Sequence, residues 1–241
     1  MFRELKNFTI VYYLLVLVFM LSVFMELQAL HYLVKPMFML ALIGFQYVQL
    51  KGNYSFFSKM VLIGLILSWV GDIALMIDEK FPILFIVGLG AFLIAHLGYS
   101  AGFVQSIKAS KSPLKWVKSL LIALPFVAFT AAFFSYVQSG LPADLYVPVL
   151  AYTIVITIMG ITATARHYHT DKKSFKWIAI GAILFILSDC VIAINKFVYD
   201  FEYDAIVNMI LYLGGQYMIT VGAVYYVKNI NSGSTDLPLS A

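Results

Sequence analysis

The sequence predicts an all-α membrane protein, a polytopic helix bundle with eight transmembrane helices. Apolar residues make up 62% of the 241-residue chain and charged residues only 12%, which is more hydrophobic surface than one water-soluble core can bury. Apolar runs of about 20 residues, the length that one helix needs to cross the hydrocarbon, recur through almost the whole chain. Helix is the expected conformation, because the alternating polar residues of a membrane β-barrel are missing.

The expected helices follow one another with short polar connections. The N-terminal MFRELKNF resembles the start of a signal peptide, but the apolar run after it is long and has no small-residue cleavage motif. We therefore interpret it as an uncleaved first span. We expect one transmembrane domain over residues 1–228 and a disordered tail over residues 229–241. The spans are expected at about residues 9–25, 32–50, 57–77, 83–106, 117–138, 145–167, 176–197 and 205–228.

Basic residues give the expected orientation. If the spans alternate, all lysine and arginine residues except Lys35, Lys80 and Lys196 fall at one face of the membrane. Lysine and arginine in short loops stay on the cytoplasmic side, so we expect both termini to be cytoplasmic. The net charge of +4 is then a topology signal and gives no reason to expect a nucleic-acid partner. The compact architecture favours a bacterial inner membrane as the location.

A short pattern occurs in both the third and the seventh span. The sequence Gly64-Leu65-Ile66-Leu67 leads to Asp72, and Gly181-Ala182-Ile183-Leu184 leads to Asp189 with the same spacing. Each of these spans is followed by a helix with a polar residue in its middle, His96 or Gln216. Two interpretations stay open, an internal duplication with parallel repeats and a chance match in apolar sequence.

Ionisable residues inside the spans are the leading functional candidates, because each costs about 2.5–3.5 kcal/mol on insertion scales. Asp72 and Asp189 are expected at the same depth, below the non-cytoplasmic boundary. Lys35 and Lys196 belong to the same half of the membrane. In the alternative interpretation, the two lysines extend to the headgroups and each aspartate fixes helix packing through a salt bridge.

The other polar residues of the spans are weaker candidates. His96 is equally compatible with a hydrogen-bonded core position, and Gln216 with a bond that joins two helices. We expect no metal site and no cofactor, since His167 and His169 lack a third ligand and Cys190 is the single cysteine. Neither Ser68 nor Ser188 has a histidine at helical spacing that could act as its base. The remaining group is a carboxyl pair in a dry site, which suits acid catalysis, because burial can keep one carboxyl group protonated beside an ionised partner.

Several short motifs occur in order along these spans and together resemble the YhhN/lysoplasmalogenase family. The resemblance covers nearly all of the chain, although no single motif is specific. The motifs are Lys35-Pro36, Ser68-x-x-Gly71-Asp72, Ala95-His96-x-x-Tyr99, Tyr152, Leu187-Ser188-Asp189, Asn195-Lys196-Phe197 and Tyr212-x-x-Gly215-Gln216.

The resemblance implies an ether hydrolase that cleaves the vinyl ether bond of lysoplasmalogens into a fatty aldehyde and a glycerophospho-headgroup. Such a reaction begins with protonation of a carbon and passes through an oxocarbenium ion, as in glycosidases. We therefore expect Asp72 and Asp189 to be the catalytic acid and its stabilising or basic partner, in either order. The expected substrate-binding residues are Lys35, Ser68, His96, Tyr99, Tyr152, Ser188, Asn195, Lys196, Tyr212 and Gln216.

Two other functions compete with this reading. Buried Asp, Lys and His also form relays in small-solute or proton-coupled transporters, although here the polar residues are concentrated in one half of the membrane. A lipid-binding or scaffold protein would bind lysophospholipid without consuming it. The expected partners are a lysophospholipid substrate and membrane lipids, and the sequence does not predict an oligomeric state.

Overall fold

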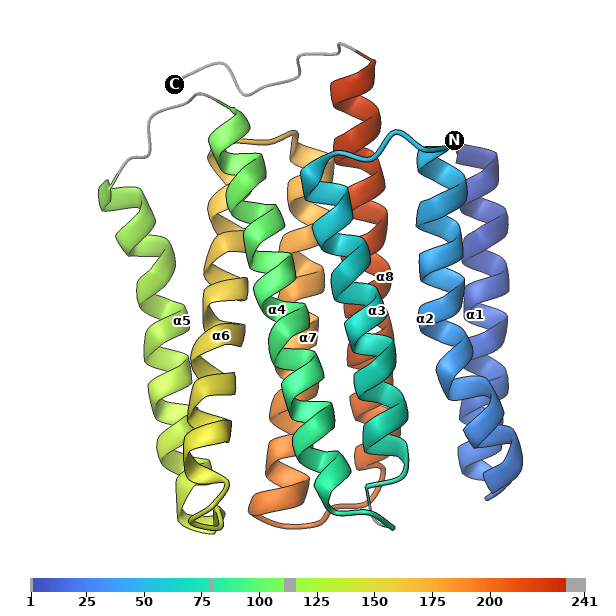
Figure 1. The fold of residues 1–241 in the computed structure, drawn as a ribbon, viewed down its shortest axis with the longest axis vertical. Helices are drawn as coiled ribbons and strands as arrows, with labels where there is room; N and C mark the ends of the chain where they lie inside the picture. Colours follow the sequence, from blue (N-terminus) through green and yellow to red (C-terminus); the bar gives the residue numbers. More distant parts are fainter. Residues whose placement is uncertain (1, 79, 111–115, 233–241) are drawn as a thin grey trace.

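Eight long helices account for most of the described chain. In the computed structural model, which describes residues 2–78, 80–110 and 116–232, they lie side by side along the long axis of the molecule (Figure 1). Short 3-10 turns, η1 (Gln138–Gly140) and η2 (Arg166–Tyr168), follow two of them. The helices are α1 (Phe2–Phe24), α2 (Gln28–Leu50), α3 (Phe56–Met76), α4 (Ile83–Ala109), α5 (Trp116–Val137), α6 (Tyr146–Ala165), α7 (Lys172–Phe197) and α8 (Asp204–Asn231).

The outer surface of the bundle is apolar, which confirms the predicted fold class. All eight helices are long and apolar enough to cross a membrane. Large side chains such as Phe24, Leu120 and Val147 are exposed on the outside of the bundle. An apolar surface of this extent is stable in lipid and would cause aggregation in water, so the chain is an integral membrane protein.

The helix ends extend beyond several predicted spans. The seventh helix begins at Lys172, where the Asp171 side chain accepts a hydrogen bond of 2.8 Å from the Ser174 backbone nitrogen and so caps the helix. The last helix continues to Asn231, into the segment predicted as a tail. Residues 233–241 of that predicted tail lie outside the described residues.

Glycine residues bring two helix pairs, α3 with α4 and α7 with α8, into the closest contact in the bundle. A β-carbon added at Gly181 would lie 2.8 Å from the Gly215 carbonyl oxygen, and one added at Gly215 would lie 2.8 Å from the Gly181 carbonyl oxygen. In the other pair, a β-carbon on Gly98 would lie 3.4 Å from the Met60 carbonyl oxygen. Small residues at helix crossings allow such close approach of two backbones in membranes.

Gly215→Ala should therefore destabilise the bundle by about 1–3 kcal/mol. The added methyl group would meet the backbone of α7, which cannot rotate away as a flexible side chain could. Thermal unfolding of the purified protein in detergent measures the effect. Gly44→Ala is the matched control, because no atom lies within 4 Å of the added β-carbon there. Equal melting temperatures for the two variants would contradict this packing argument.

A separation of 117 residues matches the bounds of α1 to α4 with those of α5 to α8 to within five residues. Tyr99 and Gln216 are equivalent under this separation, and the Tyr99 hydroxyl donates a hydrogen bond of 2.7 Å to Gln216 Oε1. A residue meets its own equivalent only near a twofold axis. The structure thus supports an internal duplication with parallel repeats. Other equivalent pairs are Gly64 with Gly181, Asp72 with Asp189 and Gly98 with Gly215.

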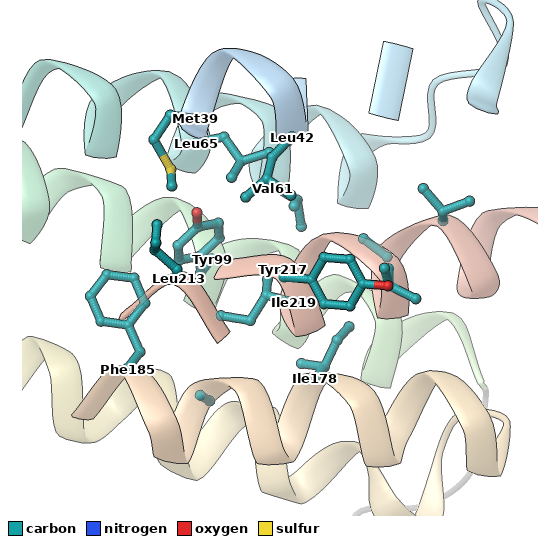
Figure 2. Packing of buried hydrophobic residues seen from close by; sticks show 14 of the residues in the cluster. Met39, Leu42, Val61, Leu65, Tyr99, Ile178, Phe185, Leu213, Tyr217 and Ile219 are labelled. Atoms are coloured by element: carbon teal, nitrogen blue, oxygen red, sulfur yellow. The ribbon is translucent and has the colours of Figure 1, made fainter. Parts of the chain in front are cut away.

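The core lies along the middle of the bundle, where α3, α4, α7 and α8 meet. Figure 2 shows Leu65 of α3, Tyr99 of α4, Phe185 of α7 and Leu213 of α8 within one cluster of buried side chains. The cluster continues toward the end of the bundle at which both α1 begins and α8 ends (Figure 1).

Arg166 closes the core at this end and has no exposed surface. Its guanidinium carbon lies 5.1, 5.7 and 5.3 Å from the ring centroids of Phe57, Phe103 and Tyr226. Nε donates a hydrogen bond to Ser106 and Nη2 donates one to Ser174. Arginine stacks on aromatic rings and forms several directed hydrogen bonds, so this one side chain joins η2 to α3, α4, α7 and α8.

Candidate active site in the membrane interior

Asp72 lies near the end of α3 and is only 5% exposed. The Tyr212 hydroxyl of α8 donates a hydrogen bond of 2.8 Å to its carboxyl group. One turn earlier on α3, Ser68 accepts a hydrogen bond of 2.9 Å from Gln216, which in turn accepts the bond from Tyr99. The structure therefore brings five predicted site residues from α3, α4 and α8 into one polar cluster.

Asp189 forms a second cluster with α4 and α6. The Tyr152 hydroxyl donates a hydrogen bond of 2.5 Å to Asp189 Oδ2, and His96 Nε2 lies 4.0 Å from the same oxygen. The His96 ring is fully buried, and neither ring nitrogen has a hydrogen-bond partner among the described residues. This histidine thus presents an unpaired polar edge beside a carboxyl group.

Aromatic rings lie between the two clusters. The Phe185 ring of α7 is 4.7 Å from the His96 ring and 5.3 Å from the Tyr212 ring, measured between centroids. Phe92 of α4 packs against both Phe185 and Tyr212. Within the part of the chain that the structure describes, no hydrogen bond joins the two carboxyl groups directly. The Phe185 ring therefore contacts a ring of each cluster, and each carboxyl group accepts a hydrogen bond from its own tyrosine.

Three predicted substrate ligands form hydrogen bonds within the protein. Lys196 Nζ donates to Asp78 Oδ2 at 2.8 Å and lies 4.0 Å from the centroid of the Phe85 ring. The partner carboxylate follows α3, in a segment that the sequence marked only as a turn. The other two join α7 to α8, where Asn195 donates to Asp204 at 2.6 Å and Ser188 donates to Asn208 at 2.5 Å.

An apolar cavity of about 90 Å³ opens beside the Asp189 cluster. Side chains of α3, α4, α5, α6 and α7 line it, and most of them are phenylalanine, isoleucine or valine. Asp189 and Tyr152 are its main polar groups, and Cys190 lies next to them. Its walls suit an aliphatic chain that ends at the carboxyl group.

A polar cavity of about 440 Å³ lies on the other side of α3. It is lined by Lys35 and His31 of α2, by Glu26 before that helix and by Asp78 after α3. Charges of both signs therefore face this space.

The two cavities share one wall residue, Leu75, which lies one turn after Asp72 on α3. An amphiphilic molecule could place its chain in the apolar cavity and its polar part in the other, with the bond between them beside the carboxyl groups. The described residues contain no group of three or more His, Cys, Asp or Glu side chains that could hold a metal ion.

The model of the YhhN family matches residues 30–223 of this chain. The chain belongs to the YhhN family. The matched segment includes every predicted site residue of this YhhN protein, from Lys35 in α2 to Gln216 in α8. No solved structure matches the chain.

Curated relatives of this YhhN protein carry the name lysoplasmalogenase. Human lysoplasmalogenase TMEM86B is 32% identical over 193 residues, which is 80% of this chain and 74% of the relative. Human lysoplasmalogenase TMEM86A is 28% identical over 170 residues, or 68% of this chain and 65% of the relative. The lysoplasmalogenase of Mycobacterium tuberculosis is 28% identical over 158 residues, which covers 66% of this chain but only 58% of the relative.

Sequence reasoning missed the residues that shape this YhhN site without taking part in ionic contacts. Leu75, Phe92 and Phe185 are ordinary apolar residues in apolar spans, so no local signal distinguishes them. Asp78 carried a stronger signal, because it is an acidic residue directly after a span with a buried carboxyl group.

Proposed function

We propose that this YhhN-family protein hydrolyses the vinyl ether bond of a lysoplasmalogen, releasing a fatty aldehyde and a glycerophospho-headgroup. The proposal rests mainly on one observation: the Asp189 carboxyl group lines an apolar cavity, and the Asp72 carboxyl group lies one turn before Leu75, which lines both that cavity and a polar one. The lysoplasmalogenases among its relatives support the same reaction class. A lysophospholipid with one long chain and one polar headgroup matches this pair of cavities in chemistry.

In this proposal the alkenyl chain occupies the apolar cavity and the headgroup occupies the polar cavity. Lys35 supplies a cation for the phosphate group, and Glu26 and Asp78 face the same space with negative charge. The vinyl ether then passes Leu75, between Asp189 on the chain side and Asp72 on the headgroup side. Remote binding of both ends positions the reacting bond, which lowers the entropic part of the barrier.

The reaction needs one proton donor and one negative charge. A carboxylic acid donates its proton to the alkenyl carbon nearer the chain, and the π electrons of the double bond form the new C–H bond. The resulting oxocarbenium ion is stabilised by the ionised carboxylate. Water adds to the cationic carbon and returns a proton to the first carboxylate, which gives a hemiacetal. Breaking its C–O bond transfers the hydroxyl proton to the glycerol oxygen and leaves the aldehyde.

The test compares 1-alkenyl, 1-acyl and 1-alkyl lysophospholipids with purified protein in detergent or liposomes. We expect aldehyde from the alkenyl lipid alone. In heavy water the aldehyde should carry one deuterium on the carbon next to the carbonyl group, because that carbon accepts the solvent-derived proton; rapid reduction to the alcohol preserves the label. Fatty acid from the acyl lipid would identify an esterase instead, and no product from any lipid would reject the proposal.

The duplicated four-helix unit is the one observation that favours a transporter, since parallel repeats are common in that class. A transporter needs access from both faces, whereas here the end that contains Arg166 is filled by buried rings. Uptake of labelled lysolipid or small solutes into proteoliposomes, in the absence of hydrolysis, would favour transport over catalysis.

A further inference from the structure

The two carboxyl groups are equivalent residues of the duplicated unit, but their surroundings are not equivalent. The separation of 117 residues that relates Tyr99 to Gln216 also relates Asp72 to Asp189. Applied to their neighbours, it relates Lys35 of α2 to Tyr152 of α6. Where the first half of the chain places an ammonium group, the second half places a neutral phenol.

One cation, Lys35 of α2, lies in the surroundings of Asp72. Lys35 lies within the range at which its charge acts on the Asp72 carboxyl group, and the Tyr212 hydroxyl donates a hydrogen bond to the same group. The hydroxyls of Tyr12 on α1 and Tyr99 on α4 also lie near enough to interact with it. A neighbouring cation favours the ionised form of a carboxyl group. The tyrosine hydrogen bond does not distinguish the two aspartates, because Tyr152 donates one to Asp189 as Tyr212 does to Asp72, so the cation is the difference.

No lysine or arginine faces Asp189 among the described contacts. The groups around it are the Tyr152 hydroxyl of α6, the His96 ring of α4 and the adjacent Cys190 thiol, while the α5 wall of the cavity offers Thr130 and phenyl rings. His96 is fully buried without a hydrogen-bond partner for either nitrogen in this part of the structure. Its Nε2 atom is 4.0 Å from the Asp189 oxygen, too far for a hydrogen bond that would stabilise an ion pair, and two charges in this dry surrounding cost more than a neutral ring beside a protonated carboxyl group.

We infer that the duplication has divided the catalytic work, with Asp72 kept ionised to stabilise the oxocarbenium ion and Asp189 kept protonated to deliver the proton. This assignment rests on the proposed hydrolysis. The cavities support it independently of the charges, since Asp189 lines the apolar cavity and Asp72 does not. In the vinyl ether, the carbon that accepts the proton lies on the chain side, which is the side of Asp189. The oxygen that shares the positive charge lies on the headgroup side, which is the side of Asp72.

The test measures binding, so it does not require turnover. The probes are a lysophospholipid with a secondary ammonium group in place of the ether oxygen, which mimics the cation, and its neutral 1-alkyl ether. Both displace a fluorescent alkyl lysophospholipid from purified protein in nanodiscs. Wild type should prefer the ammonium probe, and Asp72→Asn should lose that preference by about tenfold or more, or about 1.4 kcal/mol. Asp189→Asn should retain it, because asparagine replaces a group that is already uncharged.

Two further variants keep the test decisive if Asp72→Asn does not fold. Lys35→Met removes the cation that favours the ionised form of Asp72, so it should lower the preference for the ammonium probe over the ether, while Tyr152→Phe, the equivalent position in the second half, should leave that ratio unchanged. Loss of preference in Asp189→Asn alone would reverse the assignment. Equal loss, or no loss, in both aspartate variants would show that the two groups are not divided in this way. Failure of the hydrolysis proposal is seen separately, as absence of aldehyde from the alkenyl lipid.

Discussion

Asparagine in place of Asp72 or of Asp189 should lower the rate of aldehyde release by about 10³-fold or more. Proton transfer from a positioned acid contributes about 10²–10⁴-fold, and stabilisation of a developing charge is of comparable size. An amide cannot deliver the proton and carries no charge, yet it has nearly the shape of the carboxyl group. A coupled assay that reduces or oxidises the released aldehyde measures the rate on the alkenyl lysophospholipid.

Asp144→Asn is the matched control for both variants. Asp144 is exposed in the connection before α6, so the same chemical change there should leave the rate unchanged. Each variant must elute as a single species, which separates loss of chemistry from loss of the bundle. Near-normal rates in either buried-aspartate variant would rule out the two-carboxyl mechanism.

Arg166→Ala should lower the free energy of unfolding by about 3–5 kcal/mol, the range for removal of a large buried side chain. The change empties the space between three aromatic rings and leaves Ser106 and Ser174 without their donor. For a chain of this length, about 2–4 °C per kcal/mol gives a fall in melting temperature of roughly 10 °C. Intrinsic tryptophan fluorescence during heating in detergent provides the measurement.

Arg166→Met separates the contribution of the side chain's volume to stability from the contribution of its charge. Replacement of a buried charge by an apolar side chain of similar size is often nearly neutral, so we expect a smaller loss than with alanine. The folded fraction of either variant should keep its specific activity, because Arg166 lies at the opposite end of the core from the aspartates. An unchanged melting temperature in Arg166→Ala would show that this arginine does not hold the helices together.

Hydrophobic length was sufficient to predict the fold, because lipid demands a helix of about 20 apolar residues for each crossing. Helix ends were harder to place, since Asp171 caps α7 so that the helix begins at Lys172, four residues before the predicted span. The duplication stood on three identical residues of four and an aspartate at the same spacing in the sequence. It gained support only when Tyr99 and Gln216 were found in contact.

The site could be predicted as a set of residues but not as a set of contacts. Helical spacing places Lys196 on the same face as Asp189 two turns away, yet its ammonium group pairs with Asp78, which follows α3. Spacing along one helix fixes which face a residue occupies and carries no information about the helix that packs there. For the same reason, the ring layer of Phe92 and Phe185 between the two carboxyl groups had no signal in the sequence.

The contact between Tyr99 and its own equivalent has a consequence for how such a protein could arise. Two copies of a single four-helix chain, joined by the same twofold axis, would build a similar bundle, but identical chains must give both carboxyl groups identical surroundings. Joining the copies in one polypeptide releases them from that constraint. One half can then hold a lysine where the other holds a tyrosine. Covalent linkage therefore allows two equivalent aspartates to have different surroundings and different roles.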